Sequence, residues 1–301
     1  MPQRPVRLAT RGSPQASTQA QAVADQLREA TGRAAELVIV ETTGDRRQDV
    51  PLHVIGGQGV FVKEVQQAVL DGRADAGVHS AKDLPSTSAD GIVVAAFTRR
   101  RDPADALIGR SLAALAEGAT VATGSVRRRA QVALVRPDLR FTELRGNIAT
   151  RLGRVPEDGA IVMAVAALEV LGLTHRIAER LDPTQFVPAV GQGCVALEAR
   201  AGDEETLELL ATIDDRATRA AVTVERAFLA ELGAGCALPV GAHAAAGRLR
   251  TFLASTDQHG RHVELIVASD DIELAGDDRD LERAREAARA AKHAVGWAVP
   301  G

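Results

Sequence analysis

Residues 6–14, Val-Arg-Leu-Ala-Thr-Arg-Gly-Ser-Pro, place a short apolar run directly before a polar turn and a proline. The apolar part is typical of a buried strand. Ser13-Pro14 favours a helix start, because the missing N–H of proline costs little in the first turn. The helical pattern continues to about Gly32, and a β-branched run follows at 37–42. The stretch therefore predicts a strand–helix–strand unit of an α/β protein.

The same alternation continues through most of the chain. After a polar, glycine-bearing loop at 44–59, the spacing predicts a helix over 60–70 and buried strands over 74–79 and 92–96. Further strands and helices are predicted at 121–123, 126–135, 139–144, 148–154, 161–164, 166–171, 195–198, 204–213 and 217–232. These repeated pairs favour two α/β lobes, each around a mostly parallel sheet.

The C-terminal part has a different pattern. Three strand-like runs at 240–246, 249–255 and 263–269 precede one amphipathic helix over 281–297, which predicts a small α+β domain. A length of 301 residues allows two domains or three small ones. With 46% apolar and 25% charged residues, the composition is typical of a folded globular protein and excludes general disorder.

Composition also limits the classes of partner and the cellular compartment that we expect for this protein. The formal net charge is −4 and aromatic residues make up 2%, which disfavours a nucleic-acid partner because base stacking needs aromatic side chains. No uncharged apolar run reaches the roughly 18 residues that a membrane span needs. Met1–Arg7 lacks the apolar core of a signal peptide, and two cysteines do not make a disulfide framework. We expect a cytoplasmic protein.

The basic residues are unusual, because 33 of the 36 are arginines. Arg11, Arg127–Arg129 and Arg145 follow predicted strands, and Arg151 lies one turn into the next helix. Ligands of open α/β sheets bind beyond the carboxyl ends of the strands, so two facing lobes would gather these arginines in one cleft. Guanidinium groups suit carboxylates and phosphates. The pattern predicts a polyanion site, with a solvated helix face at 127–129 as the alternative.

Two further residues are candidates for chemistry. Asp83 lies in the basic stretch His79–Asp83, and a carboxylate there could stabilise a cationic intermediate or accept pyrrole-type N–H groups. Its alternative role is a turn former before Leu84-Pro85. Cys236 lies in a glycine-rich loop after a long helix, and such a loop can bring a thiol to a cleft. The alternative is a small core residue.

Other signals are weak. Cys194 begins a predicted strand and has a structural pattern. Gly56–Gly59 lacks the Lys-Ser/Thr pair of a phosphate-binding loop. His259 and His262 lack further ligands at metal spacing, so we expect no metal site.

Taken together and in this order, ten short segments resemble the porphobilinogen deaminase (hydroxymethylbilane synthase) family, and the combination is highly specific. The last 55 or so residues match only loosely. The segments are Ala9–Pro14, Gly59–Glu64, Val78–Pro85, Asp102–Ala106, Ser125–Arg128, Leu144–Asn147, Thr150–Leu152, Pro188–Gly193, Gly235–Cys236 and Pro239–Gly241.

The resemblance implies two α/β lobes like those of type II periplasmic binding proteins and a small C-terminal α+β domain. It places the first lobe at 1–99 and 194–216, the second at 100–193 and the third domain at 217–301. It implies a monomeric transferase of porphyrin and haem biosynthesis, with porphobilinogen as substrate. The enzyme would deaminate four porphobilinogen units, join them head to tail on a covalent dipyrromethane cofactor, and release hydroxymethylbilane.

The resemblance also implies roles for individual residues. Asp83 would be catalytic, and Cys236 would hold the dipyrromethane by a thioether. Residues 45–59 would form a lid. The residues expected to face the cofactor are Lys82, Ser125, Arg127 and Arg128. Those expected to face the substrate are Arg11, Ser13, Phe61, Arg145, Arg151 and Gln192.

Two positions depart from the family pattern. Val170 stands where the family usually has an arginine for substrate carboxylates, with Arg176 nearby in sequence, and Gln58 stands where lysine is common. These differences leave a catalytically impaired relative as one alternative. A non-catalytic anion-binding module of the solute-receptor type is the other, and a cysteine loop has no role in such a receptor.

Overall fold

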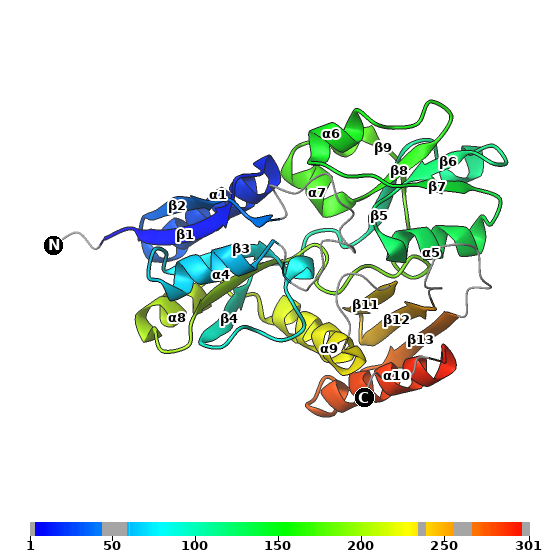
Figure 1. The fold of residues 1–301 in the computed structure, drawn as a ribbon. Helices are drawn as coiled ribbons and strands as arrows, with labels where there is room; N and C mark the ends of the chain where they lie inside the picture. The colour runs from blue at the N-terminus through cyan, green and yellow to red at the C-terminus, as the bar shows by residue number, and fades with distance from the viewer. Residues whose placement is uncertain (1–3, 44–58, 60, 234–238, 256–266, 297–301) are drawn as a thin grey trace.

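A computed structural model describes residues 4–43, 59, 61–233, 239–255 and 267–296. The chain forms three sheets with their own helices. In Figure 1 the first unit runs from blue to cyan and includes the olive α8, the second is green, and the third runs from the yellow α9 to the red α10. Within the described residues, no helix is long and apolar enough to cross a bilayer. The predicted fold class, two α/β units and a small α+β unit, is confirmed.

The first sheet has the strand order β2-β1-β3-β10-β4. β1 lies parallel to β2 and β3, whereas β10 runs antiparallel to β3 and β4. Apolar side chains of α1 and α8 pack with Leu8 and Leu197 in one buried cluster, and those of α4 pack in another with Ala9. The elements are β1 (Val6–Arg11), α1 (Pro14–Thr31), β2 (Ala35–Val40), α4 (Lys63–Leu70), β3 (Ala76–Ser80), β4 (Ile92–Phe97), β10 (Val195–Arg200) and α8 (Glu204–Ala211).

The second sheet has the order β7-β6-β8-β5-β9. β6 is parallel to β7 and β8, and β5 is antiparallel to β8 and β9. The elements are β5 (Asp105–Gly109), β6 (Thr120–Ala122), α5 (Val126–Val135), β7 (Arg140–Thr142), α6 (Ile148–Leu152), β8 (Ala160–Ala164), α7 (Val165–Val170) and β9 (Ile177–Arg180). Short 3-10 helices are η1 (Ala81–Asp83), η2 (Leu112–Ala114) and η3 (Thr174–Arg176).

Both α/β sheets are less parallel than the sequence predicts, and β5 and β9 are not predicted at all. The chain passes from the first sheet to the second through 98–104 and returns through 181–194. β5 and β10, the first strands after these crossovers, each run antiparallel to both of their neighbours. Strand direction therefore depends on the long-range path of the chain, which hydrophobic periodicity does not report.

The third sheet is antiparallel, in the order β11-β12-β13, and α9 and α10 pack against it. Phe228 of α9, Leu249 of β12 and Ala288 of α10 meet in its buried core. The predicted strand at 263–269 is confirmed only for 267–269, because β13 continues to Glu273 and 256–266 lie outside the described residues. The elements are α9 (Arg216–Leu232), β11 (Val240–Ala245), β12 (Arg248–Ala254), β13 (Val267–Glu273) and α10 (Arg279–Ala294).

The predicted starts of α1 and α5 and the predicted end of α9 are confirmed, and a capping residue fixes each of them. The Ser13 hydroxyl accepts the Ala16 N–H and starts α1, and the Ser125 hydroxyl accepts the Arg128 N–H and starts α5. Gly233 ends α9 at φ 64°, a left-handed conformation in which a Cβ would be strained.

Candidate active site

Charged side chains from both α/β units converge between the first and second sheets. Burial lowers the pKa of Arg151 to about 10, with the positive charges of Arg128, Arg145 and Arg11 lowering it further and Asp83 opposing them. Arg11 and Asp83 belong to the first unit and the other three to the second. These charges act on one group because the facing sides of the two units lie close together, as the strand-end arginines led us to expect. That these side chains line a ligand cleft stays a prediction.

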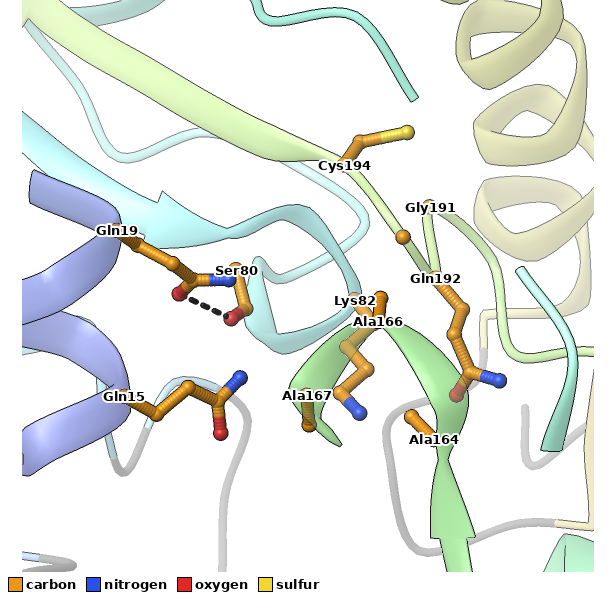
Figure 2. Close-up of a pocket in the computed structure, with 11 residues that line it drawn as sticks. Gln15, Gln19, Ser80, Lys82, Ala164, Ala166, Ala167, Gly191, Gln192 and Cys194 are labelled. Atoms are coloured by element: carbon orange, nitrogen blue, oxygen red, sulfur yellow. Dashed lines mark hydrogen bonds between the residues drawn. The ribbon is translucent and has the colours of Figure 1, made fainter. Parts of the chain in front are cut away.

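A small pocket lies between α1, η1, α7 and residues 191–194 of the returning crossover. Figure 2 shows Gln19 of α1 accepting a hydrogen bond from the Ser80 hydroxyl at 3.2 Å. Lys82 of the first unit and Gln192 of the crossover approach the same space, with Ala164 of the second unit between them. The pocket therefore lies where the returning crossover meets both units.

Lys82 adds a positive charge that depends on pH. Burial lowers its pKa to about 8, Arg128 and Arg127 lower it further, and Asp83 and Asp105 oppose the effect. The ammonium group is consequently charged below about pH 8 and increasingly neutral above it. Asp83 ends η1 beside it and is half-buried.

Arg127 and Arg128 do not form a solvated helix face. Their side chains are buried, and both guanidinium groups donate to the carboxylate of Asp105, at 2.8 Å from Nη2 in each case. Arg127 also donates to the Val187 carbonyl at 2.7 Å. Of the three neighbouring arginines only Arg129 is exposed, so the alternative holds for that residue alone.

Asp105 holds three of the predicted site residues, Arg127, Arg128 and Gln192, and is not itself predicted from the sequence. It lies in the family-like segment Asp102–Ala106, and its side chain is 1% exposed. The sequence does contain a signal for it, because Asp105 is a carboxylate at the start of an otherwise apolar run. A charge buried in a protein is normally paired, so an acidic residue in such a run indicates a buried cationic partner. Burial alone would raise its pKa, but Arg127 and Arg128 outweigh burial and hold the pKa well below its usual range.

On the other side of the cleft, the guanidinium carbon of Arg11 lies 3.9 Å from the centre of the Phe61 ring. The Arg151 Nε donates to the Gly146 carbonyl at 2.8 Å. Gly146 has φ 109°, and a Cβ there would lie 2.7 Å from Thr150. Glycine is therefore required in the turn that presents Arg145 and Arg151.

Gln192 belongs to the Asp105 cluster. Its Nε2 donates to the Pro103 carbonyl at 2.7 Å and to Asp105 at 2.8 Å, and its side chain is almost completely buried. Its Oε1 is buried and has no hydrogen-bond partner among the described residues. Whether it contacts substrate stays a prediction.

Other predicted residues are placed less directly. Cys236, Gln58, His259, His262 and positions 45–58 of the predicted lid lie outside the described residues. Cys194 is buried, and burial raises the pKa of its thiol to about 12, which agrees with a structural role. Val170 is the last residue of α7, and Arg176 is exposed in η3.

Two α/β units whose facing sides bring arginines together, and a small α+β unit, define the class as a three-unit α/β protein with a basic region between its two larger units. A family model described as "Porphobilinogen deaminase, dipyromethane cofactor binding domain" matches residues 6–208, and "Porphobilinogen deaminase, C-terminal domain" matches 219–277. The chain belongs to the porphobilinogen deaminase family.

Individual relatives agree. The chain is 49% identical to the porphobilinogen deaminase of Roseiflexus castenholzii over 241 residues, which are 78% of this chain and 80% of the relative. It is 43% identical to the probable porphobilinogen deaminase of Methanopyrus kandleri, over 87% of this chain and 86% of the relative. Among solved structures, the methionine-binding protein MetQ matches 71% of this chain and 91% of its own, at 13% identity and a TM-score of 0.44.

Proposed function

We propose that this chain is the transferase that deaminates four porphobilinogen units, joins them head to tail on a dipyrromethane cofactor and releases hydroxymethylbilane. Membership of the family supports the activity and the cofactor. The observation that carries the proposal is that Asp83 and arginines of both α/β units lie near enough to Arg151 for their charges to act on it. A cleft of this charge suits a chain of pyrroles bearing acetate and propionate groups.

The residues present fit a dipyrromethane. Its carboxylates need cations, and Lys82, Arg127 and Arg128 lie together. Its pyrrole N–H groups need acceptors, and Asp83 and the unpartnered Oε1 of Gln192 are available. We propose Cys236 as the attachment residue and Ser125 as a further contact. When bound, the dipyrromethane supplies the pyrrole carbon to which the first substrate unit is joined.

Asp83 is the proposed catalytic residue. In deamination the bond between the aminomethyl carbon and its ammonium nitrogen breaks, the electron pair leaves with ammonia, and the ring is left as a cationic azafulvene. A carboxylate that accepts the pyrrole N–H stabilises the developing positive charge. Asp83 also assists proton transfer when the new carbon–carbon bond has formed and the ring carbon loses its hydrogen.

The remaining proposed site residues bind the substrate. Arg11, Arg145 and Arg151 pair with its carboxylates, and Phe61, held under Arg11, flanks the pyrrole ring. Ser13 and Gln192 complete this set, and the Gln192 Oε1 accepts a pyrrole N–H of the cofactor or of the substrate joined to it. Val170 is uncharged and cannot pair with a substrate carboxylate. In this chain Arg11, Arg145 and Arg151 therefore bind the substrate carboxylates without an arginine at position 170.

The domain division 1–99 with 194–216, 100–193 and 217–301 is also a proposal, and the three separate sheets support it. A monomeric state, a cytoplasmic location and the lack of a nucleic-acid partner remain predictions from the sequence.

Intact mass of the purified native chain tests the proposal. We expect a mass above that of the bare chain by one dipyrromethane, lost in Cys236→Ala and kept in Cys194→Ala, the matched cysteine control. A native mass equal to that of the bare chain would contradict the cofactor.

Incubation with porphobilinogen separates the transferase from its two alternatives. Released linear tetrapyrrole supports the transferase. Stalled adducts indicate an impaired enzyme, and binding without ammonia release indicates a receptor.

A further inference from the structure

Resting on the proposed function, we propose that Asp105 is the positioning residue of the cofactor site, which fixes Arg127, Arg128 and Gln192 at once and balances the charge around Lys82. It touches neither the substrate nor the reacting carbon in this proposal. It acts through the three side chains that it holds.

The geometry of Asp105 leaves little freedom to its partners. One oxygen accepts from Arg127 Nη2 at 2.8 Å, and the other accepts from Arg128 at 3.0 Å (Nε) and 2.8 Å (Nη2) and from Gln192 Nε2 at 2.8 Å. All four side chains are buried. Two donors of Arg128 converge on the same Asp105 oxygen, and its Nη1 donates to the Val162 carbonyl at 3.1 Å. Two acceptors on different elements therefore hold its guanidinium group.

Asp105 also decides which way the Gln192 amide faces. The amide nitrogen points at two acceptors, Asp105 and the Pro103 carbonyl, so the carbonyl oxygen Oε1 must point away from both. That oxygen is buried without a partner in the described part of the chain, and Gln192 lines the pocket into which Lys82 also projects (Figure 2). A buried acceptor without a donor is costly, which points to an N–H of the bound pyrroles as its partner.

The charge of Asp105 matters beyond its hydrogen bonds. Three buried or half-buried cations, Lys82, Arg127 and Arg128, surround it, and Asp83 is the other carboxylate that faces Lys82. Asp105 is one of two groups that oppose the lowering of the Lys82 pKa. Without its charge the ammonium group would lose its proton at a lower pH, and a cation for the cofactor carboxylates would be lost within the working range.

The test compares Asp105→Asn with Asp105→Glu in the full chain. The readouts are the fraction of chains that carry the cofactor, measured by intact mass, and the turnover per loaded chain as a function of pH. For Asp105→Asn we expect the fraction of loaded chains to be about tenfold lower, because one charge-assisted contact is lost. We also expect the alkaline limb of the pH profile, where turnover falls as the pH rises, to shift to lower pH. For Asp105→Glu we expect reduced loading, because the longer arm displaces both arginines, but an alkaline limb like that of the native chain.

Asp75→Asn is the matched control. Asp75 is likewise a buried carboxylate held by two arginines, Arg4 and Arg7, but it lies in the first unit away from the Asp105 cluster. We expect this variant to lose stability while keeping the native loaded fraction and alkaline limb. A merely structural role of Asp105 would make Asp105→Asn behave in the same way.

Native loading and an unmoved alkaline limb in Asp105→Asn would overturn the proposal. If Asp105→Asn does not fold, Asp105→Glu provides the test. A native loaded fraction in Asp105→Glu, in which the carboxylate is displaced, would also overturn the proposal. A native chain without any cofactor would instead contradict the proposed function, so the two failures are distinguishable.

Discussion

The arginines at 127–129 show how little a residue type says before its surroundings are known. Three identical side chains follow one another at the start of α5, yet two are buried on Asp105 and the third is exposed. A helix places successive residues about 100° apart, so neighbours in sequence meet different environments. Burial, and not the abundance of arginine, distinguishes the two that belong to the candidate site.

At the same scale, Asp83→Asn tests the catalytic role. The amide keeps the shape of the side chain but removes the negative charge that stabilises the azafulvene cation, so we expect turnover to fall by about 10²–10³. Ammonia release from porphobilinogen measures it, with intact mass to show that the cofactor is still present. Turnover near the native value in a loaded Asp83→Asn chain would rule out this role.

At the scale of elements, short capped helices present the cationic side chains to the cleft. Ser125 starts α5 just before Arg127 and Arg128, and Asn147 starts α6, whose last turn carries Arg151, by accepting the Thr150 N–H at 2.9 Å. In each case a strand ends, a few residues turn, and a side-chain cap begins the helix. The caps therefore fix where each helix begins, and with it the positions of Arg127, Arg128 and Arg151.

Ser125→Ala separates the cap from the proposed contact with the cofactor. Loss of the cap should lower the free energy of unfolding by about 1 kcal/mol, and we expect the loaded fraction to fall as well. Asp215→Ala is the control, because Asp215 caps α9 by accepting the Thr218 N–H at 2.8 Å. It should cost similar stability, measured by denaturant unfolding, and leave loading unchanged. Equal loading in both variants would argue against a contact between Ser125 and the cofactor.

At the scale of the whole molecule, one carboxylate joins the third unit to both crossovers. Glu225 of α9 is completely buried and accepts the N–H groups of Gly191 and Ala244, each at 2.8 Å, as well as the Arg100 guanidinium. Arg100 donates from Nε to the Gln192 carbonyl at 2.9 Å. Contacts therefore run from α9, the helix that precedes Cys236, to the Asp105 cluster.

We expect Glu225→Gln to lower the free energy of unfolding by about 3 kcal/mol, because it leaves the Arg100 charge buried and unpaired. Asp271→Asn, which breaks the exposed pair with Arg248, should cost less than about 1 kcal/mol. Denaturant unfolding of both variants at neutral pH makes the comparison. A loss in Glu225→Gln no larger than that in Asp271→Asn would contradict this account.

The same variant has a predicted pH signature. Burial alone would raise the pKa of Glu225, but Arg100 and His243 outweigh it and lower the pKa below 4.5. The carboxylate thus contributes stability that is present above about pH 4.5 and is lost as the pH falls through the lower folded-state pKa. In Glu225→Gln this part of the acid sensitivity should disappear.

The sequence alone was enough to predict what depends on local order. Periodicity and caps predicted most strands and helices, such as α5 after Ser125, and the ordered segments around Asp83, Arg128 and Arg145 predicted the family and the cleft. Tertiary structure decided the rest: the antiparallel direction of β5 and β10, and the buried partners of Asp105 and Glu225. Asp105 meets partners 22, 23 and 87 residues away, and Glu225 meets one 125 residues away. A buried charge is stable only with such partners, and distant pairing is set by the packing of the whole chain.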